Sequence, residues 1–282
     1  MKYASFVTPR GVESWGVGVD DDVVADLGPG GAGLAPTLKQ AIAGGVFGSV
    51  HDLDGVPRYD VGEISFLPVI PDPGKIVCIG VNYRSHQDET GKPPPVAPTV
   101  FTRFADSQMG HLQPAVNPPT TTQFDYEGEM AVVIGRRAHL VAEDDAWDVV
   151  AGYAPYNDFS VRDWQRATSQ WTPGKNFPAT GAFGPFLVPA VEVGAVDALK
   201  LTTRVNGDLR QSASVADLVF DIPRLIAHVT GFTPLSPGDV IVTGTPGGVG
   251  LFMEPQGLLE VGDVVEVEIT GLGLLRNTVT AG

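Results

Sequence analysis

Glycine and proline residues occur along the whole chain and divide it into short apolar stretches. The 282 residues include 35 glycines and 24 prolines, and both residue types favour turns and interrupt helices and strands. Because they are spread out instead of clustered, they indicate turns between short strands and not a disordered region. We therefore predict a mostly β fold of the α+β class.

The first part of the chain, residues 1–70, alternates short apolar stretches with turns. The predicted elements are the strands Tyr3–Val7, Trp15–Val19 and Val23–Leu27, followed by a short helix over Thr37–Ala43. The closely spaced prolines of Pro71-Asp72-Pro73-Gly74 break regular structure. We expect a small β-rich N-terminal domain over residues 1–70 and a second domain over residues 71–282.

Strands also dominate the second part of the chain. The clearest predicted strands are Lys75–Gly80, Thr99–Phe104, Asp125–Gly135, Phe183–Val188, Leu199–Val205, Val240–Gly244 and Asp263–Thr270. Asn206-Gly207 is the preferred pair for a tight type I′ hairpin. Asp221 is a predicted helix N-cap, because apolar residues follow it at helical spacing. Ser160 and Asp163 have the spacing of a capping box at the start of another helix.

The composition is that of an ordinary globular protein and argues against two classes of partner. Charged residues make up 18% of the chain, and the net charge is −15. Nucleic acids and anionic membranes are bound by clustered Lys and Arg, so neither is an expected partner. No secretory signal is visible, nor any apolar run approaching about 20 residues. The one cysteine, Cys78, cannot form an internal disulfide, so we expect a buried, inert thiol and a cytoplasmic protein.

Three acidic residues alternate along a predicted strand, Asp125, Glu127 and Glu129, just before the apolar run Met130–Ile134. Residues two apart in a strand share a face, so these carboxylates are expected to project together. Such a row is costly near a core unless a positive charge compensates it. All-oxygen ligation suits Mg²⁺, Mn²⁺ or Ca²⁺, while a solvated acidic strand face is the alternative. Asp158 follows another strand and is either a further ligand or a turn residue.

His86 and Glu89 are three residues apart, so one helical turn would place them on the same face. A carboxylate beside an imidazole fixes its tautomer and raises its basicity, as a general base requires. An exposed polar turn is the alternative interpretation. Lys175 lies in the turn-like segment 173–177 and, on spacing alone, is as expected for a surface lysine.

The glycine-rich segment 243–250 invites comparison with a phosphate-binding loop. It lacks the Lys-Ser/Thr ending of a P-loop, and no clear βαβ unit surrounds it. We instead expect a tight turn after a strand, exposing Thr245 and backbone amides to a small-molecule site.

Taken together and in order, these segments resemble the fumarylacetoacetate hydrolase family over roughly residues 70–280. The motifs that carry the resemblance are Asn82-Tyr83 with His86 and Glu89, Asp125-Tyr126-Glu127-Gly128-Glu129, Asn157-Asp158 with Arg162-Asp163 and Gln165, Gly174-Lys175-Asn176-Phe177, Asn206-Gly207, Pro237-Gly238-Asp239 and Thr243–Gly250. Each motif alone is weak, but their collinear order makes a chance match very improbable.

The resemblance implies a mixed β-sandwich roll, usually a homodimer, with a small N-terminal domain in front. It also implies a set of site residues, as follows: the metal ligands Glu127, Glu129 and Asp158 for one Mg²⁺ or Mn²⁺, the catalytic residues His86, Glu89 and Lys175, and the substrate-binding residues Arg103, Arg162, Gln165 and Thr245. His86 and Glu89 would belong to a lid segment typical of the family's shorter members. Arg103 departs from the Lys-Pro of many relatives, and its different hydrogen-bond geometry leaves the substrate open.

The activity that the resemblance implies is cleavage of a C–C bond in a small β-diketo or acylpyruvate-type acid, through a metal-bound enolate. In that hypothesis His86, oriented by Glu89, activates water. Lys175 stabilises the developing negative charge. Decarboxylation of a 2-oxo acid such as oxaloacetate, or hydration or isomerisation of unsaturated 2-oxo acids, is the alternative. The expected partner is in each case a small anionic acid.

Overall fold

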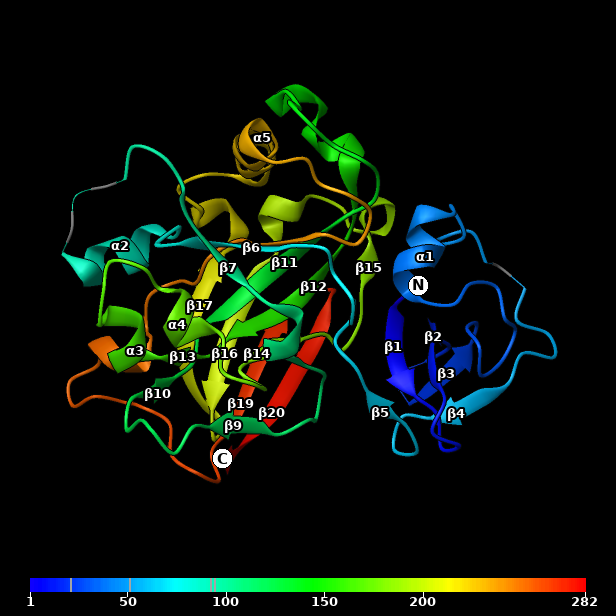
Figure 1. Ribbon diagram of the computed structural model, residues 1–282, viewed down its shortest axis with the longest axis horizontal. Coiled ribbons are helices and arrows are strands. Elements are labelled where there is room, and N and C mark those ends of the chain that lie inside the picture. The colour runs from blue at the N-terminus through cyan, green and yellow to red at the C-terminus, as the bar shows by residue number, and fades with distance from the viewer. Residues whose placement is uncertain (21, 51, 92, 94) are drawn as a thin grey trace.

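The computed structural model describes residues 1–20, 22–50, 52–91, 93 and 95–282. A small N-terminal body lies beside a larger one, and the C-terminus ends on the larger body (Figure 1). Among the described residues, no helix has the length and apolar character needed to cross a membrane. The molecule is mostly β, as the sequence predicts.

The small body is a five-stranded antiparallel sheet with one helix packed on it. Its strand order is β4-β3-β2-β1-β5. The elements are β1 (Tyr3–Val7), β2 (Glu13–Gly18), β3 (Val23–Asp26), α1 (Leu38–Ala43), β4 (Arg58–Asp60) and β5 (Ser65–Phe66). The Thr37 hydroxyl accepts the Gln40 N–H and so caps α1. These elements confirm the three strands and the helix predicted for this part of the chain.

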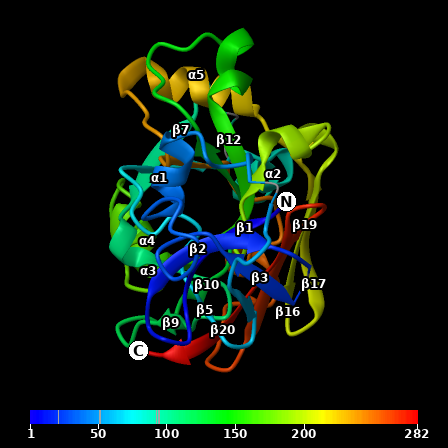
Figure 2. The ribbon, with the colours of Figure 1, turned by 90° about the vertical axis from the view of Figure 1, so that its right-hand side faces the viewer.

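The two bodies share a hydrophobic core, and Figure 2 shows the strands of the small body in front of the larger one. Tyr3 and Leu187 exchange two backbone hydrogen bonds of 2.9 and 2.7 Å. Buried Trp15 belongs to the same apolar cluster as Ala131 and Val240 in the larger body. The two parts are therefore packed together through a common apolar cluster. Their division into separate domains at residue 71 stays a prediction.

The larger body is built on an eight-stranded mixed sheet. Seven strands follow the order β7-β6-β18-β11-β12-β14-β8, and β15 also pairs with β12. Their bounds are β6 (Ile76–Gly80), β7 (Thr99–Arg103), β8 (Gln108–Met109), β11 (Gly128–Ile134), β12 (Val150–Asp158), β14 (Gly181–Phe183), β15 (Val188–Pro189) and β18 (Val240–Val242). The centre of this sheet is apolar on both faces, as expected for a sheet covered on both sides.

A second sheet packs against the first and completes a sandwich. Its order is β17-β16-β19-β20-β9. The bounds are β9 (Ala115–Asn117), β16 (Lys200–Val205), β17 (Asp208–Ser214), β19 (Val264–Ile269) and β20 (Gly273–Ala281), with β10 (Phe124–Asp125) and β13 (Ser160–Val161) as a separate short pair. Ala182 of the first sheet shares a buried cluster with Val267 and Leu275 of the second. The hairpin at Asn206-Gly207 is confirmed, with φ of 53° and 86°.

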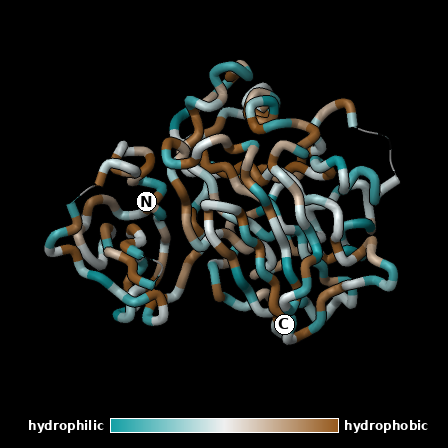
Figure 3. The backbone as a smooth tube through the Cα atoms, turned by 180° about the vertical axis from the view of Figure 1, so that it is seen from behind, coloured by the Kyte–Doolittle hydropathy of each residue, from teal (hydrophilic) through white to brown (hydrophobic). Residues whose placement is uncertain are grey.

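Helices are short and lie at the edges of the sheets. They are α2 (Arg84–Thr90), α3 (Arg162–Arg166), α4 (Thr172–Lys175) and α5 (Ile222–Phe232), with the 3₁₀ turns η1 (Ala105–Ser107), η2 (Glu143–Val149), η3 (Ala190–Glu192), η4 (Val196–Ala198), η5 (Val215–Asp217) and η6 (Gly250–Phe252). The Asp221 carboxylate accepts the Arg224 N–H, which confirms the predicted cap of α5. Helices α2, α3 and α4 gather at the end of the larger body that faces away from the small one (Figure 1). Seen from behind, the backbone of the larger body carries many hydrophobic residues in its interior (Figure 3).

Three predicted elements are wrong in detail. The strand predicted over Asp125–Gly135 is broken between β10 and β11. The strand predicted over Phe183–Val188 is interrupted, because Gly184 has a φ of 139° and Pro185 carries no N–H for a ladder. Ser160 does not begin a helix, since it lies in β13 and its hydroxyl donates to the Asp158 carbonyl, while α3 begins at Arg162.

Candidate active site and metal centre

Three buried carboxylates converge where strands β11 and β12 run side by side. Glu129 lies in β11, Glu127 immediately precedes that strand, and Asp158 is the last residue of β12. The antiparallel register pairs Gly128 with Asn157, and the Asp158 N–H donates to the Glu127 carbonyl at 2.9 Å. One carboxylate oxygen from each of the three residues lies within 4.8 Å of the others. The geometry thus brings together the residues predicted as metal ligands.

Asp125 does not join this group, which corrects the predicted row of three carboxylates on one strand face. The strand breaks after Asp125, so the alternation of side chains does not continue into Glu127. The Asp125 carboxylate instead accepts the backbone N–H groups of Gly250 and Leu251, both at 2.9 Å. It therefore anchors the loop around η6 to the edge of the site.

Three buried cations compensate the carboxylates. The Lys175 ammonium lies 2.7 Å from Glu127 Oε2 and 2.6 Å from Asp158 Oδ2. Arg162 donates to Glu127 and Arg103 donates to Asp158. Lys175 is only 1% exposed, so the surface-lysine interpretation is wrong. This arrangement satisfies the requirement that buried charges be paired.

Arg103 lies behind Asp158, away from the pocket. It is 2% exposed, and its guanidinium donates to the Thr180 hydroxyl at 2.7 Å and to the Phe159 carbonyl at 3.2 Å. Strand β7 directs this side chain inward, so the predicted contact with substrate is not supported by its position. What the guanidinium does hold is the Asp158 carboxylate.

Glu129 is the carboxylate with the least compensation. Among the described residues its only hydrogen-bond donor is the Gly244 N–H, at 2.6 Å. Burial, and then the neighbouring Asp158 and Glu127, raise the pKa of Glu129 well above its ordinary value. Burial also acts to raise the pKa of Glu127, but Lys175 and Arg162 outweigh it and lower that pKa to about 2. A further cation with a preference for oxygen, such as Mg²⁺ or Mn²⁺, fits beside Glu129 for this reason.

His86 and Glu89 form a hydrogen-bonded pair on α2. His86 Nδ1 lies 2.9 Å from Glu89 Oε2. Glu89 also accepts the Gly248 N–H, and the Ser85 hydroxyl accepts the Gly247 N–H at 3.0 Å. The helix is thereby fastened to the glycine-rich segment 243–250, and His86 is only 6% exposed. The alternative of an exposed polar turn is wrong.

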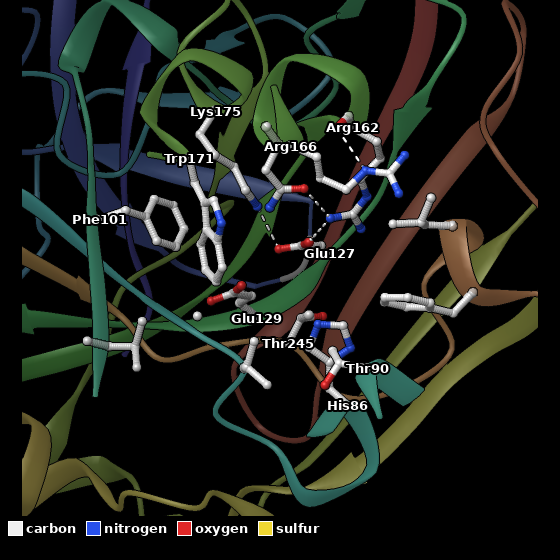
Figure 4. Close-up of a pocket in the computed structure, with 16 residues that line it drawn as sticks. His86, Thr90, Phe101, Glu127, Glu129, Arg162, Arg166, Trp171, Lys175 and Thr245 are labelled. Carbon is white, nitrogen blue, oxygen red and sulfur yellow. Dashed lines mark hydrogen bonds and ion pairs between the residues drawn. The ribbon is translucent and has the colours of Figure 1, made fainter. Parts of the chain in front are cut away.

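A cavity of about 110 Å³ lies in front of the carboxylates. Figure 4 shows His86 and Glu127 facing it from opposite sides. The lining residues are Ile79, Gly80, Val81, His86, Thr90, Phe101, Glu127, Glu129, Arg162, Gln165, Arg166, Trp171, Lys175, Thr245, Leu251 and Phe252.

Among the residues predicted to bind substrate, Arg162, Gln165 and Thr245 do line the cavity. The Thr245 hydroxyl is already engaged, because it donates to the Gly128 carbonyl at 2.9 Å and accepts the Gln211 amide at 2.8 Å. Its hydroxyl therefore fixes the position of the loop.

The sequence analysis missed the aromatic wall of the cavity and one arginine. Phe101 and Trp171 contact each other edge to face with ring centroids 5.6 Å apart. Close packing against Gly80 seats the Trp171 ring, because a Cβ at that position would lie 2.0 Å from it. Arg166 carried one usable signal, since it follows Arg162 at the i, i+4 spacing of a shared helix face.

Two packed sheets carry a cluster of buried carboxylates that could hold a divalent metal ion, and comparison with known proteins gives the family. The family model described as fumarylacetoacetate (FAA) hydrolase C-terminal matches residues 75–280, and the chain belongs to this family. A bovine (Bos taurus) mitochondrial protein named oxaloacetate tautomerase FAHD2B is 42% identical over 226 residues, which are 79% of this chain and 72% of that protein.

Solved structures agree over the whole chain. The fumarylacetoacetate hydrolase of Exiguobacterium antarcticum is 33% identical with a TM-score of 0.87, and all of both chains is covered. Maleylpyruvate hydrolase from Sphingobium sp. SYK-6, described in complex with manganese(II) and pyruvate, is 29% identical with a TM-score of 0.83 and the same full coverage. The similar proteins are thus enzymes that differ in the reaction they are named for.

Proposed function

We propose that this protein is a metal-dependent tautomerase of a small 2-oxo dicarboxylic acid of the oxaloacetate type. The observation that carries the proposal is a cavity lined by His86, Glu127 and Glu129. Asp158 converges on the same carboxylate cluster, and Glu89 holds the His86 ring. The name of the bovine relative supports tautomerisation over the C–C hydrolysis expected first from the sequence. Proton transfer of this kind needs no attacking water, and the small cavity favours a small acid.

Glu127, Glu129 and Asp158 would hold the Mg²⁺ or Mn²⁺ ion. When bound there, such an ion polarises the carbonyl of a 2-oxo acid and makes the adjacent carbon more acidic. Arg103 and Arg162 keep two of the three carboxylates in position, because Arg103 donates to Asp158 and Arg162 donates to Glu127.

His86 would move the proton. With Nδ1–H donating to Glu89, Nε2 carries the lone pair and can act as a base toward the cavity. In the keto-to-enol direction Nε2 accepts a proton from the carbon next to the carbonyl, the oxygen takes up a proton from solvent, and the imidazolium releases its proton to solvent. The enol-to-keto direction reverses these transfers. Glu89 stabilises that imidazolium and holds the ring orientation.

Lys175 would stabilise the negative charge that develops on the carbonyl oxygen. Burial lowers the pKa of this ammonium, but Asp158 and Glu127 outweigh burial and raise it. The group therefore remains positively charged and acts as an electrostatic partner, not as a base. The aromatic wall of Phe101 and Trp171 limits access of water, which strengthens that interaction.

The substitution His86→Gln tests this proposal, since glutamine can still donate to Glu89. We expect kcat for oxaloacetate tautomerisation, followed by the absorbance of the enol, to fall by about 10² to 10⁴-fold. The exposed His139→Gln is the matched control and should leave kcat unchanged. Removal of divalent metal with EDTA should abolish turnover, and Mn²⁺ should restore it. Full activity of His86→Gln would rule out His86 as the base.

C–C hydrolysis is the second candidate, favoured by the neighbour described as maleylpyruvate hydrolase with manganese(II) and pyruvate. In that reaction His86 would deprotonate water instead of substrate. Product analysis with an acylpyruvate beside oxaloacetate separates the two. Cleavage of the acylpyruvate without tautomerisation of oxaloacetate would establish the hydrolase.

A further inference from the structure

The cationic side chains around the cavity differ in whether they have a carboxylate partner. Four of its lining residues can carry positive charge, and they are His86, Arg162, Arg166 and Lys175. Three of them face carboxylates, since His86 pairs with Glu89, Arg162 with Asp125 and Glu127, and Lys175 with Glu127 and Asp158. Arg166 has no carboxylate partner anywhere in the described part of the chain.

The hydrogen bonds of Arg166 hold it in place without neutralising it. Its Nε donates to the Arg162 carbonyl at 3.3 Å, and its Nη2 donates to the Gln123 side-chain oxygen at 2.9 Å. Both acceptors are uncharged. Within the residues that the structure describes, Nη1 has no acceptor, so the guanidinium can still bind a carboxylate through two N–H groups.

Arg166 stands at the mouth of the cavity. It is exposed, and it also lines an open groove of about 510 Å³ with Thr168 and Ser169. In the view of Figure 4 the Arg162 guanidinium lies between Lys175 and that of Arg166. A ligand gripped at Glu127 and Glu129 would therefore meet Lys175 at its inner end and Arg166 at its outer end.

We propose that Arg166 binds the distal carboxylate of the substrate and so selects dicarboxylic 2-oxo acids over monocarboxylic ones. This rests on the proposed function, which places the 2-oxo acid end of the ligand at Glu127, Glu129 and Asp158. A guanidinium that lines the mouth of the cavity without a carboxylate partner can bind one, and the second carboxylate of a dicarboxylic acid is a group that fits it. The net charge of −15 makes such a local cation necessary to attract a dianion.

The first test measures binding and does not depend on turnover. Malate and 2-hydroxybutanoate differ in the distal carboxylate, and neither can tautomerise. In titrations of the Mn²⁺-loaded protein we expect malate to bind at least tenfold more tightly. In Arg166→Met this preference should fall below threefold, with the Mn²⁺ affinity unchanged. Arg58→Met, on the exposed strand β4, changes the net charge equally and should keep the preference.

The second test uses oxaloacetate and its 4-ethyl ester, which lacks the distal charge. Arg166→Met should lower kcat/KM for oxaloacetate by about 30-fold or more and for the ester by less than threefold. Equal losses on both substrates, or an unchanged binding preference for malate, would overturn the proposed role of Arg166. Absence of turnover in the unmodified protein, with the malate preference still dependent on Arg166, would instead refute only the proposed reaction.

Discussion

Lys175→Met is the substitution that tests the charge balance of the site most directly. Methionine has nearly the length of the lysine stem, so the apolar contacts of the side chain are retained and the ammonium alone is lost. That ammonium contacts both Glu127 and Asp158 and lies 5.2 Å from the centre of the Phe101 ring. Its removal leaves two buried carboxylates with one cation each.

The magnitude follows from burial. Removing one partner of a buried ion pair costs about 3–5 kcal/mol, and the cation–π contact adds roughly 1 kcal/mol. Arg162 still compensates Glu127 and Arg103 still compensates Asp158. The loss in unfolding free energy should therefore lie near the lower end, at about 3 kcal/mol.

A divalent ion should recover part of this loss. An ion at 100 times its dissociation constant stabilises the native state by about 2.7 kcal/mol. The variant has one positive charge fewer beside the carboxylates, so we expect its Mn²⁺ affinity to be about tenfold higher, which adds about 1.4 kcal/mol. The difference in unfolding free energy between the variant and the unmodified protein should then decrease from about 3 kcal/mol without the ion to about 1.5 kcal/mol with it.

Urea unfolding in EDTA and in excess Mn²⁺ measures both quantities, and the exposed Lys200→Met is the matched control. Equal stability of Lys175→Met and the unmodified protein in EDTA would show that the ammonium does not compensate the carboxylates. A deficit that Mn²⁺ leaves unchanged would show that the ion binds elsewhere.

Two further substitutions test the aromatic wall and the partly buried His111. Gly80→Ala places a Cβ 2.0 Å from the Trp171 ring, so it should cost about 1–3 kcal/mol and lower kcat/KM, whereas Gly62→Ala, with open space, should do neither. Burial, and then Arg276, lower the pKa of His111 from 6.5 to about 4, and its neutral Nδ1 accepts the Arg276 N–H at 3.0 Å. Its stabilising contribution is therefore present above pH 6.5 and lost as the pH falls toward 4, by about 1–2 kcal/mol between about pH 7 and 5 for a partly exposed ring. His111→Asn should show that much less acid sensitivity in urea unfolding, and an identical pH profile would contradict this account.

The fold could be predicted from the sequence wherever a local signal decided the structure. Asp221 and Thr37 accept backbone N–H groups at the starts of their helices, and Asn206-Gly207 forms its hairpin. These features depend on residues within a few positions of one another. Ser160 fails as a helix start because its hydroxyl bonds to the preceding Asp158 carbonyl instead of to the helix.

The site depends on contacts between distant segments, which spacing does not reveal. Lys175 is 48 residues from Glu127 and 17 from Asp158, so nothing in its neighbourhood distinguishes it from a surface lysine. Asp158 meets Glu127 through the register of β11 and β12. For both residues it was the family resemblance that predicted a position in the site. Arg103 pairs with Asp158 instead of lining the cavity, so its contact with substrate stays a prediction. A position that matches a family motif does not fix which way a side chain points.

The charges of the site bear on how a metal ion and an anionic substrate would bind in the proposed function. At the site, four buried carboxylates lie beside three buried Lys and Arg side chains, namely Asp125, Glu127, Glu129 and Asp158 beside Arg103, Arg162 and Lys175. The uncompensated negative charge falls on Glu129, whose raised pKa reflects it. A divalent ion bound at Glu127, Glu129 and Asp158 would more than cancel that charge, and the cavity would then attract an anion. In our proposals, ion and substrate binding would be coupled through electrostatics, and Arg166 would extend the positive region outward to the second charge of a dianion.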